Sequence, residues 1–230
     1  MKPKILEFAD LDELAREGSK LFAEAGLKAI SARGEFVLAL AGGKTPRPLY
    51  EMIARKSTLP KKQIYLIPGD ERCLPLGDNA RNQTLLEQSL STVGNLLSVP
   101  AGLDPKLVSL AWESELSIFF EKRPRKNGLP VLDLAILGMG EDGHTASLFP
   151  GMLYSEESKA MTHAVENIGV PRVPRVTLSM EFLRNAKERW LVISGEKKIG
   201  LIEKILSGDR LANELPAAKV RPTAILLANE

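Results

Sequence analysis

The segment LDLAILGMGEDGHTASLFPG, residues 132–151, places a histidine beside acidic residues in a glycine-rich turn. An imidazole has a reference pKa of about 6.5, so His144 can accept or donate a proton near neutral pH. A carboxylate, either Asp142 or Asp70, can fix the tautomer of the ring. The apolar run before the turn predicts a strand that would present Asp142, Gly143 and His144 at its end. We therefore interpret His144 as a catalytic imidazole, with a purely structural histidine as the alternative.

The same turn also matches a second pattern, because Gly138, Gly140 and Gly143 form the G-x-G-x-x-G of dinucleotide-binding proteins. That fingerprint needs a long helix after the last glycine and an acidic residue about 20 positions further on. Here a Pro-Gly pair interrupts the next helix-like run after a few residues, and His163 stands at the expected acidic position. The sequence therefore disfavours a nicotinamide oxidoreductase.

A second glycine pair begins the segment AGGKTPRPLYEMIA, residues 41–54. Glycine permits positive φ and close approach by a ligand, while Thr45 and Pro46 suit the cap and the first position of a helix. A helix N-terminus attracts anions, and Lys44 adds a full positive charge. We expect a phosphate-binding loop here, although a tight turn that needs glycine only for geometry is the alternative. The candidate phosphate ligands are Gly42, Gly43, Lys44 and Thr45.

Three charged residues, Asp70, Glu71 and Arg72, follow the apolar run 63–68. A carboxylate at a strand end can orient a sugar hydroxyl, a histidine or a water, and an arginine can bind phosphate or stabilise an oxyanion. A surface salt-bridge cluster is the alternative. Cys73 lies next to them, but no neighbour in the sequence would activate it as a nucleophile.

Basic residues also occur in the second half of the chain. Arg175 starts a β-like run, and Ser179 is a suitable helix cap. Lys197 and Lys198 fall in the first turn of another predicted helix, where a cation is disfavoured unless an anion is also present. Salt-bridged surface lysines are the alternative interpretation.

Short apolar runs alternate along the chain with segments of helical periodicity. The predicted strands are residues 4–8, 35–40, 63–68, 131–137, 188–194 and 223–228, and the predicted helices are residues 11–32, 46–55, 81–90, 112–122 and 196–206. Strands that are apolar nearly throughout are typical of a parallel sheet covered on both faces, and the alternation predicts a doubly wound α/β fold. Ligands of such sheets bind beyond the carboxyl ends of the strands, where all the candidate residues lie. No linker divides the chain, so we expect one domain over residues 1–230.

The composition excludes several function classes. A net charge of +2 on 230 residues argues against nucleic-acid binding driven by bulk charge. One cysteine and two histidines exclude an intrachain disulfide and a His/Cys zinc site, and suit a reducing compartment. The sequence shows neither a signal peptide nor an apolar run of the roughly 20 residues that a membrane span needs. We therefore expect a cytoplasmic protein without nucleic-acid or membrane partners.

Four segments, in this order, resemble those of the 6-phosphogluconolactonase family, whose superfamily also contains glucosamine-6-phosphate deaminases. They are LALAGGKTPRPLYEMIA, GDERCLPLGDNARNQTLL, LDLAILGMGEDGHTASLFPG, and VPRVTLSMEFLRNA followed by VISGEKK. The resemblance implies a modified Rossmann-like α/β fold with a doubly wound, mostly parallel sheet flanked by helices. It also implies hydrolysis of 6-phospho-D-glucono-1,5-lactone to 6-phosphogluconate in the oxidative pentose phosphate pathway, with neither cofactor nor metal. The partner would then be a small sugar-phosphate lactone, and we expect a monomer.

The resemblance further implies roles for individual residues. The catalytic histidine of the family falls on His144, and the aspartate and arginine of its D-E-R motif fall on Asp70 and Arg72. The phosphate loop falls on residues 42–45. The other substrate-binding residues implied are Arg175 and Lys197 for the phosphate, and Asn82, Gly140, Asp142 and Gly143 for the rest of the substrate.

Some residues depart from the family pattern. Ala41 and Lys44 replace serines of the phosphate loop, and Arg81 stands where a serine is frequent, pointing either to substrate or to solvent. A deaminase is the second reading, but Arg72 replaces its tyrosine and Ser147-Leu148-Phe149 replaces a segment that carries an extra acid. A non-catalytic sugar-phosphate sensor is a third reading.

Overall fold

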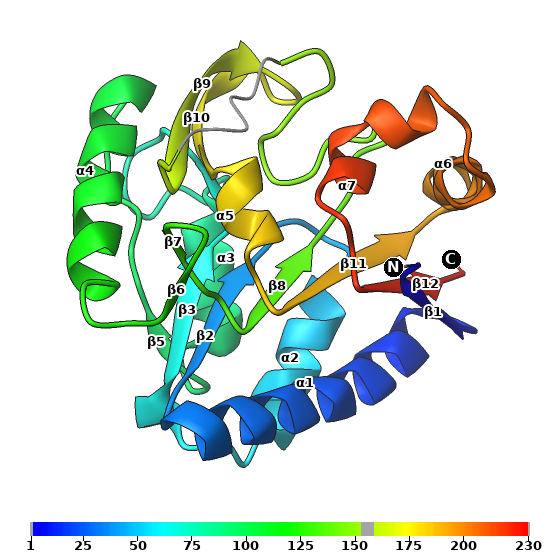
Figure 1. Ribbon diagram of the computed structural model, residues 1–230, viewed down its shortest axis with the longest axis horizontal. Helices are drawn as coiled ribbons and strands as arrows, with labels where there is room; N and C mark the ends of the chain where they lie inside the picture. Colours follow the sequence, from blue (N-terminus) through cyan, green and yellow to red (C-terminus); the bar gives the residue numbers. More distant parts are fainter. Residues whose placement is uncertain (1, 153–158, 230) are drawn as a thin grey trace.

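The computed structural model describes residues 2–152 and 159–229 and shows a twisted parallel sheet between two layers (Figure 1). Among these residues seven strands form the main sheet, and every pairing in it is parallel. In spatial order they are β1 (Lys4–Phe8), β12 (Ala224–Ala228), β11 (Glu188–Ser194), β8 (Leu134–Leu137), β2 (Phe36–Leu40), β3 (Ile64–Pro68) and β5 (Asn95–Leu96). The mostly parallel sheet predicted from the apolar runs is confirmed.

The central strand β2 explains why these runs lack alternation. All five of its side chains are buried. Phe36, Leu38 and Leu40 enter one hydrophobic cluster, whereas Val37 and Ala39 enter the cluster on the other face of the sheet. Successive side chains of a strand point to opposite faces, so a strand covered on both sides must be apolar at every position.

Helices cover both faces of the sheet. The first cluster contains side chains from α1 (Leu11–Arg33), α2 (Arg47–Lys56) and α3 (Asn82–Leu90). The second contains side chains from α4 (Pro105–Phe119), α5 (Met180–Arg184), α6 (Glu196–Ser207) and α7 (Pro216–Lys219). Short 3₁₀ turns at η1 (Lys61–Gln63) and η2 (Ala212–Glu214) complete the helical elements described.

Two smaller sheets were not predicted. β4 (Asp70–Arg72), β10 (Val173–Leu178) and β9 (Thr162–Ile168) form an antiparallel sheet in which Thr177 pairs with Asp70 and Arg175 with Arg72. β6 (Arg125–Lys126) and β7 (Leu129–Pro130) form a short antiparallel hairpin. The antiparallel sheet matters for function, because it brings residues 70–72 and 175 together across about 100 positions of sequence.

Two predicted element starts were wrong by three or more residues, and one predicted helix cap was wrong. The helix predicted over 112–122 is α4, which begins at Pro105 after Asp104 accepts hydrogen bonds from the next two free backbone amides. The strand predicted over 131–137 begins only at Leu134. Pro46, and not Thr45, is the N-cap residue of α2, which begins at Arg47 without a side-chain capping hydrogen bond. The predicted cap of α5 is confirmed, since Ser179 accepts a hydrogen bond from the amide of Phe182.

Candidate active site

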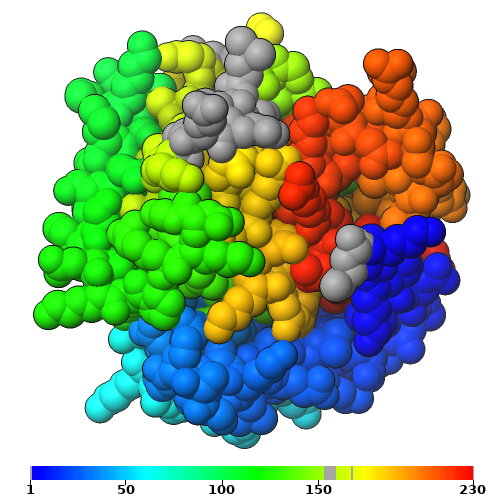
Figure 2. Space-filling view, in the orientation of Figure 1, coloured from blue at the N-terminus to red at the C-terminus, as the bar shows by residue number. Residues whose placement is uncertain are grey.

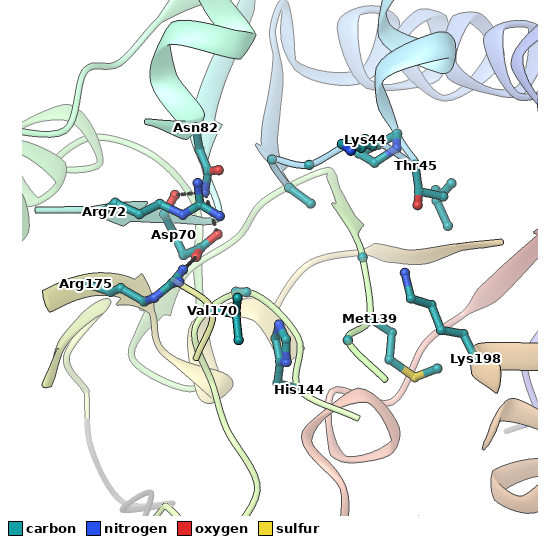
Figure 3. Close-up of a pocket in the computed structure, with 18 of the residues that line it drawn as sticks. Lys44, Thr45, Asp70, Arg72, Asn82, Met139, His144, Val170, Arg175 and Lys198 are labelled. Carbon is teal, nitrogen blue, oxygen red and sulfur yellow. Dashed lines mark hydrogen bonds and ion pairs between the residues drawn. The ribbon is translucent and has the colours of Figure 1, made fainter. Parts of the chain in front are cut away.

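A cavity of about 250 Å³ opens at the carboxyl ends of the central strands (Figure 3). Loops after β2 and β8, the short strand β4 and the first turn of α6 all contribute to its wall. Of the candidate site residues, the structure brings to this wall Gly42, Gly43, Lys44, Thr45, Asp70, Arg72, Asn82, Gly140, His144 and Arg175. It does not bring Lys197, Asp142 or Gly143 into the lining.

His144 lies at the cavity with one ring nitrogen occupied by a carboxylate. Nδ1 of His144 is 2.5 Å from Oδ1 of Asp142, and the same oxygen accepts a hydrogen bond from the His144 amide at 3.1 Å. A carboxylate can only accept, so Nδ1 carries the proton and the lone pair of the neutral ring resides on Nε2. The sequence left open whether Asp70 or Asp142 orients the imidazole, and the geometry selects Asp142.

The glycines of the turn make room for this pair. A Cβ on Gly140 would lie 2.1 Å from Cε1 of His144 and 2.7 Å from Oδ1 of Asp142. Gly143 has a φ of +83°, and a Cβ there would meet the side chain of Leu215 at 2.7 Å. Both glycines therefore serve the backbone geometry and close packing of the turn, and Phe149 stacks near the His144 ring at 4.7 Å between centroids.

Asp70 occupies a buried polar network rather than the vicinity of the histidine nitrogen. Its Oδ1 accepts from Nδ2 of Asn82 at 2.9 Å, and its Oδ2 accepts from Oγ of Ser147 at 2.5 Å. Nη1 of Arg175 lies 4.0 Å from Oδ2 (Figure 3). The hydrogen bonds from Asn82 and Ser147 thus hold the side chain of Asp70 in a fixed position at the cavity wall.

The two arginines at the cavity also hold backbone oxygens. Arg175 donates to the carbonyls of Ile168 and Pro171 and thereby ties the β9–β10 turn to the site. Burial lowers the pKa of Arg175, and the charge of Arg72 acts in the same direction, while Asp70 opposes them. Arg72 donates to the carbonyl of Ala80, and its buried Nε has no hydrogen-bond partner within the described chain.

Arg81 points neither to substrate nor to solvent, which corrects both alternatives drawn from the sequence. It is 2% exposed, donates to the carbonyls of Leu74 and Val99, and lies 3.5 Å from Glu71. Glu71 accepts hydrogen bonds from the amides of Arg72, Asn82 and Gln83. The pair therefore fixes the start of α3, and with it Asn82, beside the cavity. Burial raises the pKa of Glu71, and these amides and Arg81 act against that rise.

Asn82 and Tyr50 pack against the backbone of the 42–45 loop and hold it in position. A Cβ on Gly42 would lie 1.9 Å from Oδ1 of Asn82, and Gly43 has a φ of +97°. Oη of Tyr50 donates to the carbonyl of Ala41 at 2.8 Å, and burial raises the pKa of that phenol. Both glycines are needed for the backbone path, whose Lys44 and Thr45 face the cavity.

Lys198, and not Lys197, reaches the cavity. Lys197 is exposed and binds Oε2 of Glu141 at 3.1 Å on the outer side of the turn. Lys198 lines the cavity and extends toward the 42–45 loop (Figure 3). The sequence placed both lysines in the first turn of α6, and adjacent positions of a helix differ by about 100° in direction, so only one of them can face inward.

The sequence also missed several neutral residues of the site. Ser147 is fully buried and bonded to Asp70, while Phe149 and Val170 line the cavity beside His144. Their only signal was proximity to the histidine segment and to Arg175. Cys73 is buried, and burial raises its pKa to about 11, so it is no nucleophile at neutral pH.

The cavity has a positive charge balance. Four cationic side chains, Lys44, Arg72, Arg175 and Lys198, line it with one carboxylate, Asp70. Such a surplus favours an anionic ligand of small size. In the part of the chain that the structure describes, no three His, Cys, Asp or Glu side chains converge as donors for a metal ion. The helices within that part include none that is long and apolar enough to traverse a bilayer.

A parallel sheet with an imidazole–carboxylate pair and a cationic, glycine-lined cavity at its carboxyl edge defines an α/β enzyme with a site for a small anion. Residues 9–228 match the family model described as glucosamine-6-phosphate isomerases/6-phosphogluconolactonase, and the chain belongs to this family.

Individual relatives agree with this membership. The chain is 32% identical over 209 residues to the 6-phosphogluconolactonase of Synechocystis sp., covering 87% of this chain and 83% of the relative. It is 31% identical over 199 residues to the 6-phosphogluconolactonase of Thermotoga maritima, and the match covers 84% of this chain and 83% of the relative. The crystal structure of the Thermotoga maritima 6-phosphogluconolactonase has a TM-score of 0.83 at 26% identity and covers 100% of both chains. The family and fold predicted from the sequence are confirmed.

Proposed function

We propose that this chain hydrolyses 6-phospho-D-glucono-1,5-lactone to 6-phosphogluconate, with His144 as the general base. The relatives reported above carry the name 6-phosphogluconolactonase, which supports a lactone-hydrolysing enzyme. The observation that carries the proposal is the shared cavity: an imidazole oriented by Asp142 faces the same small space as the 42–45 loop and Lys198.

The phosphate is held at one end of the cavity. Backbone amides of residues 42–45 and the charges of Lys44 and Lys198 suit a dianionic phosphoryl group. Asp70, fixed by Asn82 and Ser147, is available to accept from a sugar hydroxyl. Binding at these two points would place the lactone carbonyl near His144. Such positioning of a bound substrate accounts for a large part of the activation free energy that an enzyme removes.

The chemistry needs one water and one base. Nε2 of His144 takes a proton from water, and the hydroxide oxygen forms a bond to C1 of the lactone. The tetrahedral oxyanion is stabilised by Arg72 or by backbone amides of the glycine turn. The C1–ring oxygen bond then breaks, and His144 returns its proton to that oxygen, which leaves an open-chain acid that ionises. Asp142 stabilises the imidazolium while it exists.

A deaminase activity is disfavoured, because the chain lacks the extra acidic residue of the deaminase segment. Phe149 stands where the deaminase segment carries an extra acid, and in the structure it is buried with its ring close to that of His144. Ring opening and isomerisation need several proton transfers, in which a phenyl ring cannot take part. The cytoplasmic location and the absence of a cofactor stay predictions.

The test is a coupled assay on freshly generated lactone, corrected for spontaneous hydrolysis, with glucosamine 6-phosphate assayed in parallel. We expect turnover of the lactone only. His144→Ala should lower kcat by roughly 10²–10⁴, the usual contribution of a general base. Undiminished kcat in His144→Ala refutes the assignment of the base. Sugar-phosphate binding without turnover in the unmodified protein instead supports the sensor.

A further inference from the structure

The outer side of α4 and the loop before it carry an uncovered apolar stripe. Leu103, Leu107, Leu110 and Ile118 are 70%, 66%, 69% and 74% exposed. Their spacing of four, three and eight positions places them along one side of the helix. We call these four residues the α4 stripe. The opposite, inner side of the helix is also apolar, but its side chains Val108, Trp112 and Leu116 are buried in the core. α4 therefore carries apolar residues on both sides.

The position of α4 leaves the stripe without cover. α4 contacts β9 and β10 on its inner side and lies at the left edge of the molecule (Figure 1), where its outer surface is open (Figure 2). Single exposed leucines are ordinary on a protein surface. Four of the nine large hydrophobic residues exposed within the described chain belong to this one stripe, and such a concentration of exposed apolar side chains is typical of an interaction site.

The exposed side chains between Leu110 and Ile118 are mostly small. Ala111, Ser114 and Ser117 are exposed there, and Glu115 is exposed at one flank of the stripe. Small side chains allow two helices to approach to the 8–10 Å of close packing. The flanking leucines would then interdigitate on either side of the point of closest approach.

The charges at the two ends are complementary for an antiparallel partner of the same sequence. Asp104 and Lys106 lie at the N-terminal end of α4, and Glu121 and Lys122 follow its C-terminal end. With a two-fold axis near the middle of the helix, Lys106 of one copy lies beside Glu121 of the other, and Asp104 lies beside Lys122. A parallel arrangement would instead place each of these charges beside its own kind.

We propose that two copies of this chain associate through antiparallel packing of their α4 helices about a two-fold axis. Such an interface is isologous, and the same patch must complement itself. A helix of 15 residues is about 22 Å long, so the contact falls at the small end of the range for specific interfaces. We therefore expect a weak dimer, in contrast to the monomer expected from the sequence. No residue of α4 lines the cavity, so both sites of the dimer stay open.

Sedimentation velocity at protein concentrations from about 1 to 500 μM provides the test, because a dimer with a micromolar Kd would pass from mostly monomer to mostly dimer over this range. We expect the weight-average mass to rise from one chain to two. Leu110→Glu should abolish the rise, whereas Leu27→Glu, at a leucine of α1 that is 58% exposed, should leave it unchanged. A monomer at every concentration overturns the proposal, and so does an equal loss in both variants.

Charge reversal tests the antiparallel register. Lys106→Glu and Glu121→Lys should each weaken the dimer at least several-fold, and the double variant should restore it, because the pair across the axis is re-formed in the opposite sense. Failure of the double variant to recover the association contradicts the arrangement.

Cross-linking gives a second readout that does not depend on affinity. Ser114→Cys lies near the proposed axis and should form a disulfide-linked dimer under mild oxidation, while Leu27→Cys should not. The native Cys73 is buried and does not compete. Equal cross-linking of the two variants counts against the α4 interface. Lactonase activity per chain should be the same in all these variants, because the changes lie outside the cavity.

Discussion

At the scale of single residues, the proposed site depends on one carboxylate that decides which histidine nitrogen is free. Asp142 binds both the amide and Nδ1 of His144 through the same oxygen, so it fixes the ring position and its tautomer together. Glu141 lies next to it in sequence but turns away and binds Lys197. The two acids form a natural matched pair for mutation.

Asp142→Asn should lower kcat at least tenfold, and by no more than the roughly 10²–10⁴ that loss of the general base itself costs, and change KM little. The asparagine amide has the same shape as the carboxylate but carries no charge to stabilise the imidazolium. It can also present either its oxygen or its NH2 group to Nδ1, so it no longer fixes the tautomer. Glu141→Gln should retain full kcat. Initial rates on fresh lactone measure both variants, and equal kcat values in the two would show that Asp142 does not position the base.

The adjacent lysines of α6 separate phosphate binding from surface charge. Lys198→Ala should raise KM by roughly 10- to 100-fold, because a hydrogen bond to a charged group contributes about 1.5–3 kcal/mol. Lys197→Ala loses only an exposed ion pair with Glu141, so its KM should change by no more than about twofold. Saturation kinetics on both variants check this, and a larger effect at Lys197 would reverse the assignment.

At the scale of elements, the site is held by contacts between segments that are distant in sequence. The most buried of these is the pair of Glu71 and Arg81, each with a side chain 1% exposed, which fixes β4 to the start of α3. Asn82 follows directly and holds Asp70 in place. The position of a candidate substrate ligand therefore depends on an ion pair that lies outside the cavity.

Glu71→Gln should destabilise the fold by about 3 kcal/mol or more, because it leaves the charge of Arg81 buried without its partner. The amide also places a donor against one of the backbone amides that Glu71 accepts from. Glu51→Gln, in an exposed pair with Arg55, should cost less than about 1 kcal/mol. Urea unfolding measures both, and similar midpoints would contradict a stabilising role for Glu71.

The elements also show what the sequence could and could not predict. Strands with buried faces on both sides, such as β2, are evident from their unbroken apolar runs. The antiparallel sheet of β4, β9 and β10 has no such pattern, because β4 is three residues long and its partners are distant in sequence. The predicted start of α4 is too late, because the apolar periodicity around Trp112 indicates a helix from that residue, whereas the helix begins after the cap at Asp104-Pro105.

The same limit applies to the site. Strand-end residues such as Asp70 and His144 were found because a parallel sheet brings its carboxyl ends to one edge. The choice between Lys197 and Lys198, or between Asp142 and Asp70 at the imidazole, depends on which way a side chain points. Such directions follow from packing and not from residue type, so only the structure resolves them.

At the scale of the whole molecule, the two hydrophobic clusters share the strands of one sheet. β2 contributes alternate side chains to both, so loss of one cluster exposes a face of the strand that supports the other. The organisation of residues 1–230 as one domain stays a prediction, and this shared sheet favours a single unfolding transition. A half-buried titratable group makes the free energy of this transition depend on pH.

His163 of β9 is such a group, because burial lowers its pKa in the folded protein while Glu113 acts in the opposite direction. Above its unfolded pKa of about 6.5 the ring is neutral in both states and costs nothing. Below that value the unfolded chain binds a proton that the folded protein binds less readily. The free energy of unfolding should therefore fall between about pH 6.5 and the lower pKa of the folded state.

His163→Gln removes this proton from the unfolded state, so its free energy of unfolding should decrease less than that of the unmodified protein as the pH is lowered from about 7.5 to 5.5. Thermal unfolding of the two proteins across this interval measures the difference between their slopes. Other titrating groups, Glu71 among them, contribute equally to both proteins and cancel in that difference. Parallel curves would mean that His163 titrates alike in the folded and unfolded chain, which the half-buried position of its side chain argues against.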